Sequence, residues 1–110
     1  MSDLPFEPPM IIDFHAHLHQ PGTTKWAEIN HFDRTVLLSG PARESNMEVL
    51  EFCNASNGAY IPYCRTFLED IPLACKQVRE YADMGFRGVK FQPLTDRFLP
   101  HEKRMYPLWE

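Results

Sequence analysis

The sequence predicts an α/β fold of about four strand–helix units with parallel strands. Short apolar stretches rich in Ile, Val, Leu, Phe and Tyr alternate with longer segments of helical periodicity. Clusters that contain Pro, Gly or Asn separate these segments at short intervals. Regular alternation with short links favours parallel strands that are joined by right-handed crossovers.

The first predicted strand covers residues 11–19, and its Ile and Phe residues are strong strand formers. Because side chains alternate along a strand, two faces are expected. One face would carry Asp13, His15 and His17, and the other would carry Ile12, Phe14 and Ala16. Imidazole nitrogens bind zinc at about 2.0–2.1 Å, so two rings held together on one strand can share an ion. His15 and His17 are therefore candidate metal ligands, and the alternative is two polar residues at a strand end.

The next elements follow from local signals. Residues 23–32 are a modest helix candidate. Residues 35–39 form a continuous apolar run, as expected of a strand that is buried on both faces. Ser45 and Glu48 form a capping-box pattern that opens a second helix, and Gly58 lies where that helix stops.

A third strand and a third helix are predicted after this point. Residues 59–64 read as a strand, in which Pro62 removes one amide donor and so indicates a weak strand or a bulge. Asp70 is placed to cap the following helix, and Gly85 is placed to close it.

The fourth predicted strand covers residues 86–92, with Lys90 and Gln92 on one face. Residues 94–106 are expected to be a polar loop, and residues 107–110 the first turn of another helix. Like the histidines of the first strand, Lys90 and Gln92 fall at the C-terminal end of a parallel strand. In α/β enzymes this end carries the active site.

Composition excludes several classes of protein. The chain is 44% apolar and 24% charged, which is typical of a globular domain, and its net charge of −4 argues against a nucleic-acid surface. No apolar run reaches membrane-spanning length, and residues 1–9 lack the features of a secretory signal. Cys53, Cys64 and Cys75 are widely spaced, so reduced buried thiols in a cytoplasmic protein are expected.

Two longer motifs carry a resemblance to a known family. Residues 11–17 read Ile-Ile-Asp-Phe-His-Ala-His, and residues 85–93 read Gly-Phe-Arg-Gly-Val-Lys-Phe-Gln-Pro. Together they resemble the opening and fourth strands of the amidohydrolase-related metal-dependent hydrolases, a branch that also contains metal-dependent decarboxylases. The resemblance covers nearly the whole chain. It implies a (βα)₈ TIM barrel with a catalytic divalent metal, usually zinc, and His15 and His17 as two of its ligands.

The same resemblance implies parts that this chain does not hold. The family takes further His ligands from its fifth and sixth strands, and an Asp from its eighth strand binds the metal and orients or deprotonates the water. A complete barrel needs about 250 residues. We therefore expect residues 1–110 to be a truncated N-terminal portion of such a domain, without a catalytic residue of its own.

Other candidate site residues are expected to act around the ligands. In binuclear relatives a carboxylated lysine bridges two metals near the end of the fourth strand. The branch resembled here usually holds one metal, so Lys90 is expected to line the site. Gln92 stands where many relatives carry a His, and it is taken as a site-lining residue. Asp13 is expected to contact the ligands or the strand end and not to bind the metal directly. His19 is expected at the rim, and His101 in solvent.

The function implied is attack of metal-activated water on a small-molecule substrate of the carbonyl type. A metal lowers the pKa of bound water toward about 7, so hydroxide is available at neutral pH. Hydrolysis of an amide, ester or lactone fits this chemistry, and so does decarboxylation by a lyase of the same family. A non-catalytic half-barrel remnant or interaction module is the alternative of another class. A phosphoesterase ranks last, because no Ser-Asp-Gly type of continuation follows His17.

Two properties of the isolated chain follow. Catalytic zinc typically takes three protein ligands, so this chain is expected to bind metal weakly and to turn over nothing. Half a barrel leaves two open sheet edges. We therefore expect it to form a homo-oligomer, to aggregate or to fold marginally.

Overall fold

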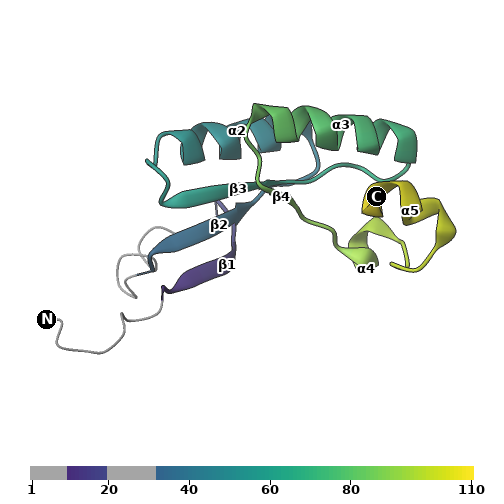
Figure 1. Ribbon diagram of the computed structural model, residues 1–110, viewed down its shortest axis with the longest axis horizontal. Coiled ribbons are helices and arrows are strands. Elements are labelled where there is room, and N and C mark those ends of the chain that lie inside the picture. Colours follow the sequence, from purple (N-terminus) through teal and green to yellow (C-terminus); the bar gives the residue numbers. More distant parts are fainter. Residues whose placement is uncertain (1–9, 20–31) are drawn as a thin grey trace, which may run out of the picture.

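The computed structural model describes residues 10–19 and 32–110. Its elements in chain order are β1 (Ile12–Ala16), β2 (Arg34–Leu38), α2 (Arg43–Asn54), β3 (Tyr60–Cys64), α3 (Ile71–Met84), β4 (Gly88–Val89), α4 (Pro93–Asp96), the 3₁₀ helix η1 (Lys103–Met105) and α5 (Tyr106–Trp109). The four strands form one parallel sheet in the order β1-β2-β3-β4 (Figure 1). The predicted parallel α/β fold is thus confirmed. Of the helix expected over residues 23–32, all but the last residue lie outside the described residues.

Helices α2 and α3 cover the same face of the sheet (Figure 1). Consecutive strands are neighbours, and the α2 and α3 crossovers both return on that one face. A doubly wound sheet has helices on both faces, whereas the wall of a βα barrel has them on the outside alone. The described strands form an open sheet of this singly wound kind and do not close on themselves.

Two apolar clusters hold the helices on the sheet. The first consists of Ala16, Leu37, Val49 and Cys53, and the second of Leu50, Cys64, Tyr81 and Phe86. All three cysteines are buried free thiols, as predicted. Burial raises the pKa of Cys53 and of Cys64 to about 11, so both are protonated and unreactive at neutral pH.

The ends of α3 are as predicted, but the start of α2 is not. Asp70 accepts a hydrogen bond from the Leu73 amide at 3.0 Å, and Gly85 ends α3 with a φ of 121°. At α2, the expected capping box does not form, because the helix already begins at Arg43, before Ser45. The Ser45 hydroxyl instead accepts a hydrogen bond from the Gly40 amide at 2.8 Å and so fixes the loop after β2.

Pro62 does not produce a bulge in β3. The β2–β3 register runs without interruption through Pro62, whose carbonyl accepts a hydrogen bond from the Arg87 amide at 3.0 Å. Arg87 immediately precedes the short strand β4. The amide donor that Pro62 lacks is therefore not needed for the β3–β4 pairing, which begins at Tyr63 and Gly88. Strand β4 is itself shorter than the predicted strand over residues 86–92.

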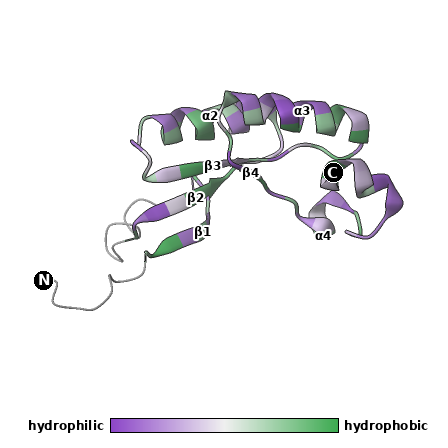
Figure 2. Ribbon diagram, in the orientation of Figure 1, coloured by the Kyte–Doolittle hydropathy of each residue, from purple (hydrophilic) through white to green (hydrophobic). Residues whose placement is uncertain are grey.

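The region predicted as a polar loop over residues 94–106 has a core of its own. Leu68, Ala74, Phe98 and Met105 form a third buried cluster between this region and the start of α3. The Trp109 indole donates a hydrogen bond to the Pro100 carbonyl at 2.9 Å and closes the region onto α5. The apolar residues Leu94, Phe98, Leu99 and Met105 lie among polar ones in this region, and hydrophilic colour covers much of its ribbon in Figure 2. Across residues 10–19 and 32–110, no helix combines the length and apolarity needed to cross a membrane.

Candidate metal centre

Strand β1 contains an irregularity that decides where its histidines lie. Asp13 is paired with Thr35, but Ala16 is paired with Leu37. Three steps along β1 therefore match two steps along β2, as at a β-bulge. An extra residue of this kind reverses the alternation of faces beyond it.

The prediction that Ile12, Phe14 and Ala16 share one face is wrong because of this shift. Phe14 lies on the face without helices, where its ring meets the edge of Tyr63 with centroids 6.4 Å apart. Ala16 lies on the opposite face, in the cluster with Leu37 under α2. The bulge thus places Ala16 under the helix layer, and the two histidines on either side of it lie at the C-terminal end of β1.

His15 and His17 are brought together at this end of the sheet. Their Nε2 atoms lie 3.3 Å apart, and the ring planes are inclined by 70°. A tetrahedral zinc ion that binds two nitrogens at about 2.0–2.1 Å holds them about 3.3 Å apart. The spacing therefore fits one shared cation, and it equally allows an N–H···N hydrogen bond between the two rings. Within residues 10–19 and 32–110, no group of three or more metal-ligating side chains is found.

The surroundings of His17 favour its neutral form. Partial burial of the ring lowers the pKa of His17 below 6.5, and the charges of His15, Lys90 and Arg65 lower it further. A hydrogen bond with the backbone of Leu38 acts in the opposite direction. Neutral imidazole is the form that binds metal. The positive charges of Lys90 and Arg65 that favour this form would also repel a bound cation.

Asp13 acts on the backbone of the same strand. Its Oδ1 accepts a hydrogen bond from the His15 amide at 3.1 Å, across the bulged segment. This contact fixes the chain where His15 departs from it. The carboxylate thus contacts the backbone of His15, and the expectation that Asp13 supports a metal ligand stays a prediction.

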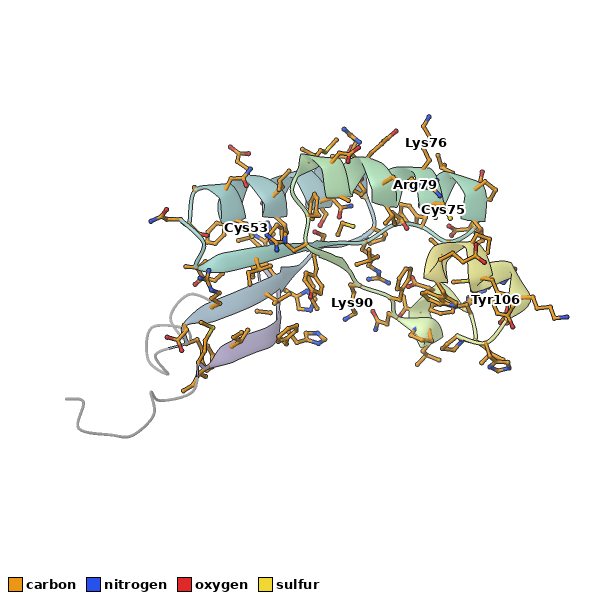
Figure 3. The ribbon with its side chains drawn as sticks, in the orientation of Figure 1. Cys53, Cys75, Lys76, Arg79, Lys90 and Tyr106 are labelled. Atoms are coloured by element: carbon orange, nitrogen blue, oxygen red, sulfur yellow. The ribbon has the colours of Figure 1, made fainter. Side chains whose placement is uncertain are left out.

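Lys90 and Gln92 no longer belong to one strand. The Lys90 amide donates to the Cys64 carbonyl at 2.8 Å, and its side chain lies on the face without helices (Figure 3). The chain then leaves the sheet, and Gln92 becomes the exposed residue before α4, with its amide donating to Asp96 at 3.0 Å. Strand alternation therefore no longer places Gln92 beside Lys90, because β4 ends at Val89.

The other two predicted histidines are exposed. His19 lies in the turn after β1, where its Nε2 is 2.5 Å from a carboxylate oxygen of Glu48 on α2. This pair ties the end of β1 to the helix layer. His101 lies in the C-terminal region, at a turn between α4 and η1.

A buried polar network at the same edge of the sheet was not predicted. Asn46 is fully buried on α2, and its side chain donates to the Arg65 carbonyl and accepts from the Arg65 amide, both at 2.9 Å. The Arg65 guanidinium in turn donates to Asp96 at 2.8 Å. The sequence did carry a signal, because Asn46 lies at helical spacing from Val49, Leu50 and Cys53 on the buried face of α2.

A hollow of about 690 Å³ opens at the other end of the strands. Its lining includes Phe14, Arg34, Ile61, Tyr63 and Arg87, and it does not include His15 or His17. In βα architectures the N-terminal ends of the strands serve stability, and the chemistry lies at the C-terminal ends. We therefore place the candidate site at the histidine pair and not in this hollow.

The C-terminal edge of the sheet thus offers two imidazoles for one cation with cationic side chains beside them. The imidazoles can ligate a divalent metal, and the cations can attract an anionic or carbonyl oxygen toward it. Comparisons of the chain with protein-family models, with curated proteins and with solved structures found no match.

Proposed function

We propose that this chain supplies the first ligand pair of a metal-dependent hydrolase of the amidohydrolase-related type. In this proposal His15 and His17 would hold a divalent metal, zinc first, which would supply an activated water for hydrolysis of a small-molecule substrate of the carbonyl type. The observation that supports it most is the 3.3 Å between the two Nε2 atoms, which matches the separation expected for tetrahedral zinc.

The fold gives the proposal a second support. All four strands are parallel and sequential, with α2 and α3 on a single face, as in one half of a (βα)₈ barrel. In such a barrel the face without helices becomes the interior, and the C-terminal ends of the strands carry the site. Lys90 lies on that face (Figure 3), and the His15–His17 pair lies at that end. By the resemblance, the remaining ligands would come from a fifth, a sixth and an eighth strand, and the described sheet consists of β1 to β4.

Each described residue has a distinct task in this proposal. The bound metal would supply a Lewis acid and a water with a pKa near about 7. His15 and His17 hold the cation through Nε2, and Asp13 fixes the backbone that carries His15. The lowered pKa of His17 favours its neutral form, which is the form that binds metal. The Lys90 ammonium provides a positive charge on the interior face, where it can stabilise negative charge that develops on a carbonyl oxygen.

A non-catalytic interaction module is the second candidate, and one observation favours it. Phe14 lies on the sheet face without helices and remains 61% exposed. Exposed apolar patches of this kind mark surfaces that bind another polypeptide. Under this candidate the histidines would have no affinity for metal above that of any exposed imidazole pair.

Calorimetric titration with zinc distinguishes the two candidates. The chain is expected to bind one zinc ion weakly, with two protein ligands, and either His15→Ala or His17→Ala is expected to abolish the saturable heat. His101→Ala is the matched control, because His101 is exposed and lies far from β1 along the chain. Equal binding by all four proteins would contradict the hydrolase proposal. Stoichiometric, tightly held zinc would show that more than two ligands are already present.

A further inference from the structure

A second hollow, of about 460 Å³, lies at the C-terminal edge of the sheet. Its walls come from the loop between β2 and α2, the loop between β3 and α3, and the segment from α4 to η1. The charged side chains that line it are Arg65, Glu69, Asp96, Arg97 and Arg104. Hollows of this size hold small-molecule ligands in other proteins.

The lining has three arginines and two carboxylates, and Glu102, which pairs with Arg104 from outside the lining, balances the third arginine. Arg65 is held rigidly, because its side chain is only 13% exposed and donates to Asp96, which is 10% exposed. Arg104 is held by Glu102 at 2.7 Å and also donates to the Arg97 carbonyl at 3.1 Å. The Arg97 guanidinium itself has no acceptor among the described residues.

The backbone of Arg97 is unusual for its residue type. It adopts a φ of 56° and a ψ of 56°, in the left-handed region, and ends α4. Glycine and asparagine adopt this conformation at less cost than a residue with a long side chain. The backbone conformation therefore does not explain the presence of an arginine at position 97. A role for its cationic side chain at the wall of the hollow would explain it.

We propose that this hollow binds an oxyanion, a carboxylate group of the substrate first, through Arg97 and Arg104, with Arg65 as a fixed wall. Arginine forks bind carboxylate and phosphate in a bidentate manner. The Arg97 fork would bind in this way, whereas Arg104, which already donates through Nε and Nη2, would add its charge and its remaining nitrogen. Arg65 follows β3, and the histidine pair lies at the C-terminal end of β1 in the same parallel sheet. The oxyanion site stands without the metal, and only its role as a substrate anchor rests on the proposed function.

The test is a titration of the metal-free chain with succinate and with inorganic phosphate, followed by backbone amide NMR at constant ionic strength. Saturable shifts of amides in residues 95–105 are expected in the millimolar range, and stronger shifts with succinate than with phosphate would favour a carboxylate ligand. Arg97→Asn is expected to abolish the saturation while it leaves the thermal stability equal or higher, because Asn suits the left-handed backbone. Arg104→Gln is expected to weaken the binding at least fivefold.

Arg79 is an exposed residue of α3, so Arg79→Gln is the matched control and should bind as the wild type does. Linear, non-saturating shifts in the wild type would overturn the proposal, and so would unchanged binding by the Arg97→Asn variant. A lower stability of Arg97→Asn would instead assign Arg97 a structural role and would also count against it. Zinc titration is a separate measurement, so failure of the oxyanion site and failure of the metal proposal are distinguishable.

Discussion

The fold lowers the pKa of His17, one of the two candidate metal ligands. Partial burial lowers the pKa of this imidazole, and the charges of His15 and Lys90 add to the effect. The folded chain therefore binds a proton at His17 less readily than the unfolded chain does. Stability then rises with pH through the window just below 6.5, and this contribution is lost as the pH falls through the folded-state pKa.

The measurement for this prediction is an NMR titration of the His17 ring together with unfolding by urea. The ring should titrate with a midpoint below 6.5. Between about pH 5 and about pH 7, the free energy of unfolding should rise less steeply in His17→Gln than in the wild type. A midpoint at or above 6.5 would contradict the description of this environment.

Gly88 is a position at which the absence of a side chain is required by a neighbouring ring. A Cβ atom placed on it would lie 2.4 Å from the ring of Tyr63, on the neighbouring strand β3. We expect Gly88→Ala to destabilise the chain by about 1–3 kcal/mol, because the ring must move from its place on the uncovered face. In the background Tyr63→Leu the same change should cost much less. Equal losses in both backgrounds, measured by urea unfolding, would rule out the clash.

The closeness of His15 and His17 could be predicted from side-chain alternation along a strand, whereas the bulge in β1 could not. A bulge is a property of pairing between Asp13 and Thr35 and between Ala16 and Leu37, and those partners are distant in sequence. Alternation brought His15 and His17 together correctly. It misplaced Ala16, because burial under α2 determined the face that this residue occupies.

At the scale of elements, local signals predicted α3 better than α2. Asp70 and Gly85 act at the two ends of α3 as expected, because both signals concern only backbone groups within a few residues. At α2 the capping-box pattern competed with an alternative use of Ser45, which binds Gly40 in the loop after β2. The fold of residues 93–110 depends on packing between Phe98, Met105 and α3, which no local pattern records.

Removal of the α3 cap is the prediction at this scale. Asp70→Ala should lower the free energy of unfolding by about 1 kcal/mol, because the Leu73 amide loses its acceptor. Asp70→Asn should retain most of the stability, and Asp83→Ala, an exposed change near the other end of α3, should have little effect. Thermal and urea unfolding of the three variants measure this, and a loss at Asp83 equal to that at Asp70 would contradict the capping role.

At the scale of the whole molecule, no described strand pairs with the outer edge of β1 or of β4, and the described helices cover one face of the sheet. Parallel sheets are normally covered on both faces, so the uncovered face of β1 to β4 favours association with another polypeptide. We expect the isolated chain to self-associate in the micromolar range. Phe14→Glu should shift it toward the monomer, since Phe14 is the most exposed apolar residue described in β1.

Analytical ultracentrifugation measures this association. Leu94→Glu is the matched control, because Leu94 is 91% exposed but lies on α4, away from the sheet. It should leave the oligomeric state unchanged. A stable, monodisperse wild-type monomer would contradict the half-barrel interpretation of the sheet.

The central claim is that His15 and His17 bind one cation together, and ¹⁵N NMR of the histidine rings during zinc addition tests it most directly. The account predicts that the Nε2 signals of both rings shift in parallel with the first equivalent of zinc, while those of His101 do not. It also predicts that His15→Ala removes the shift at His17. Independent responses of the two rings, or none at all, would contradict it.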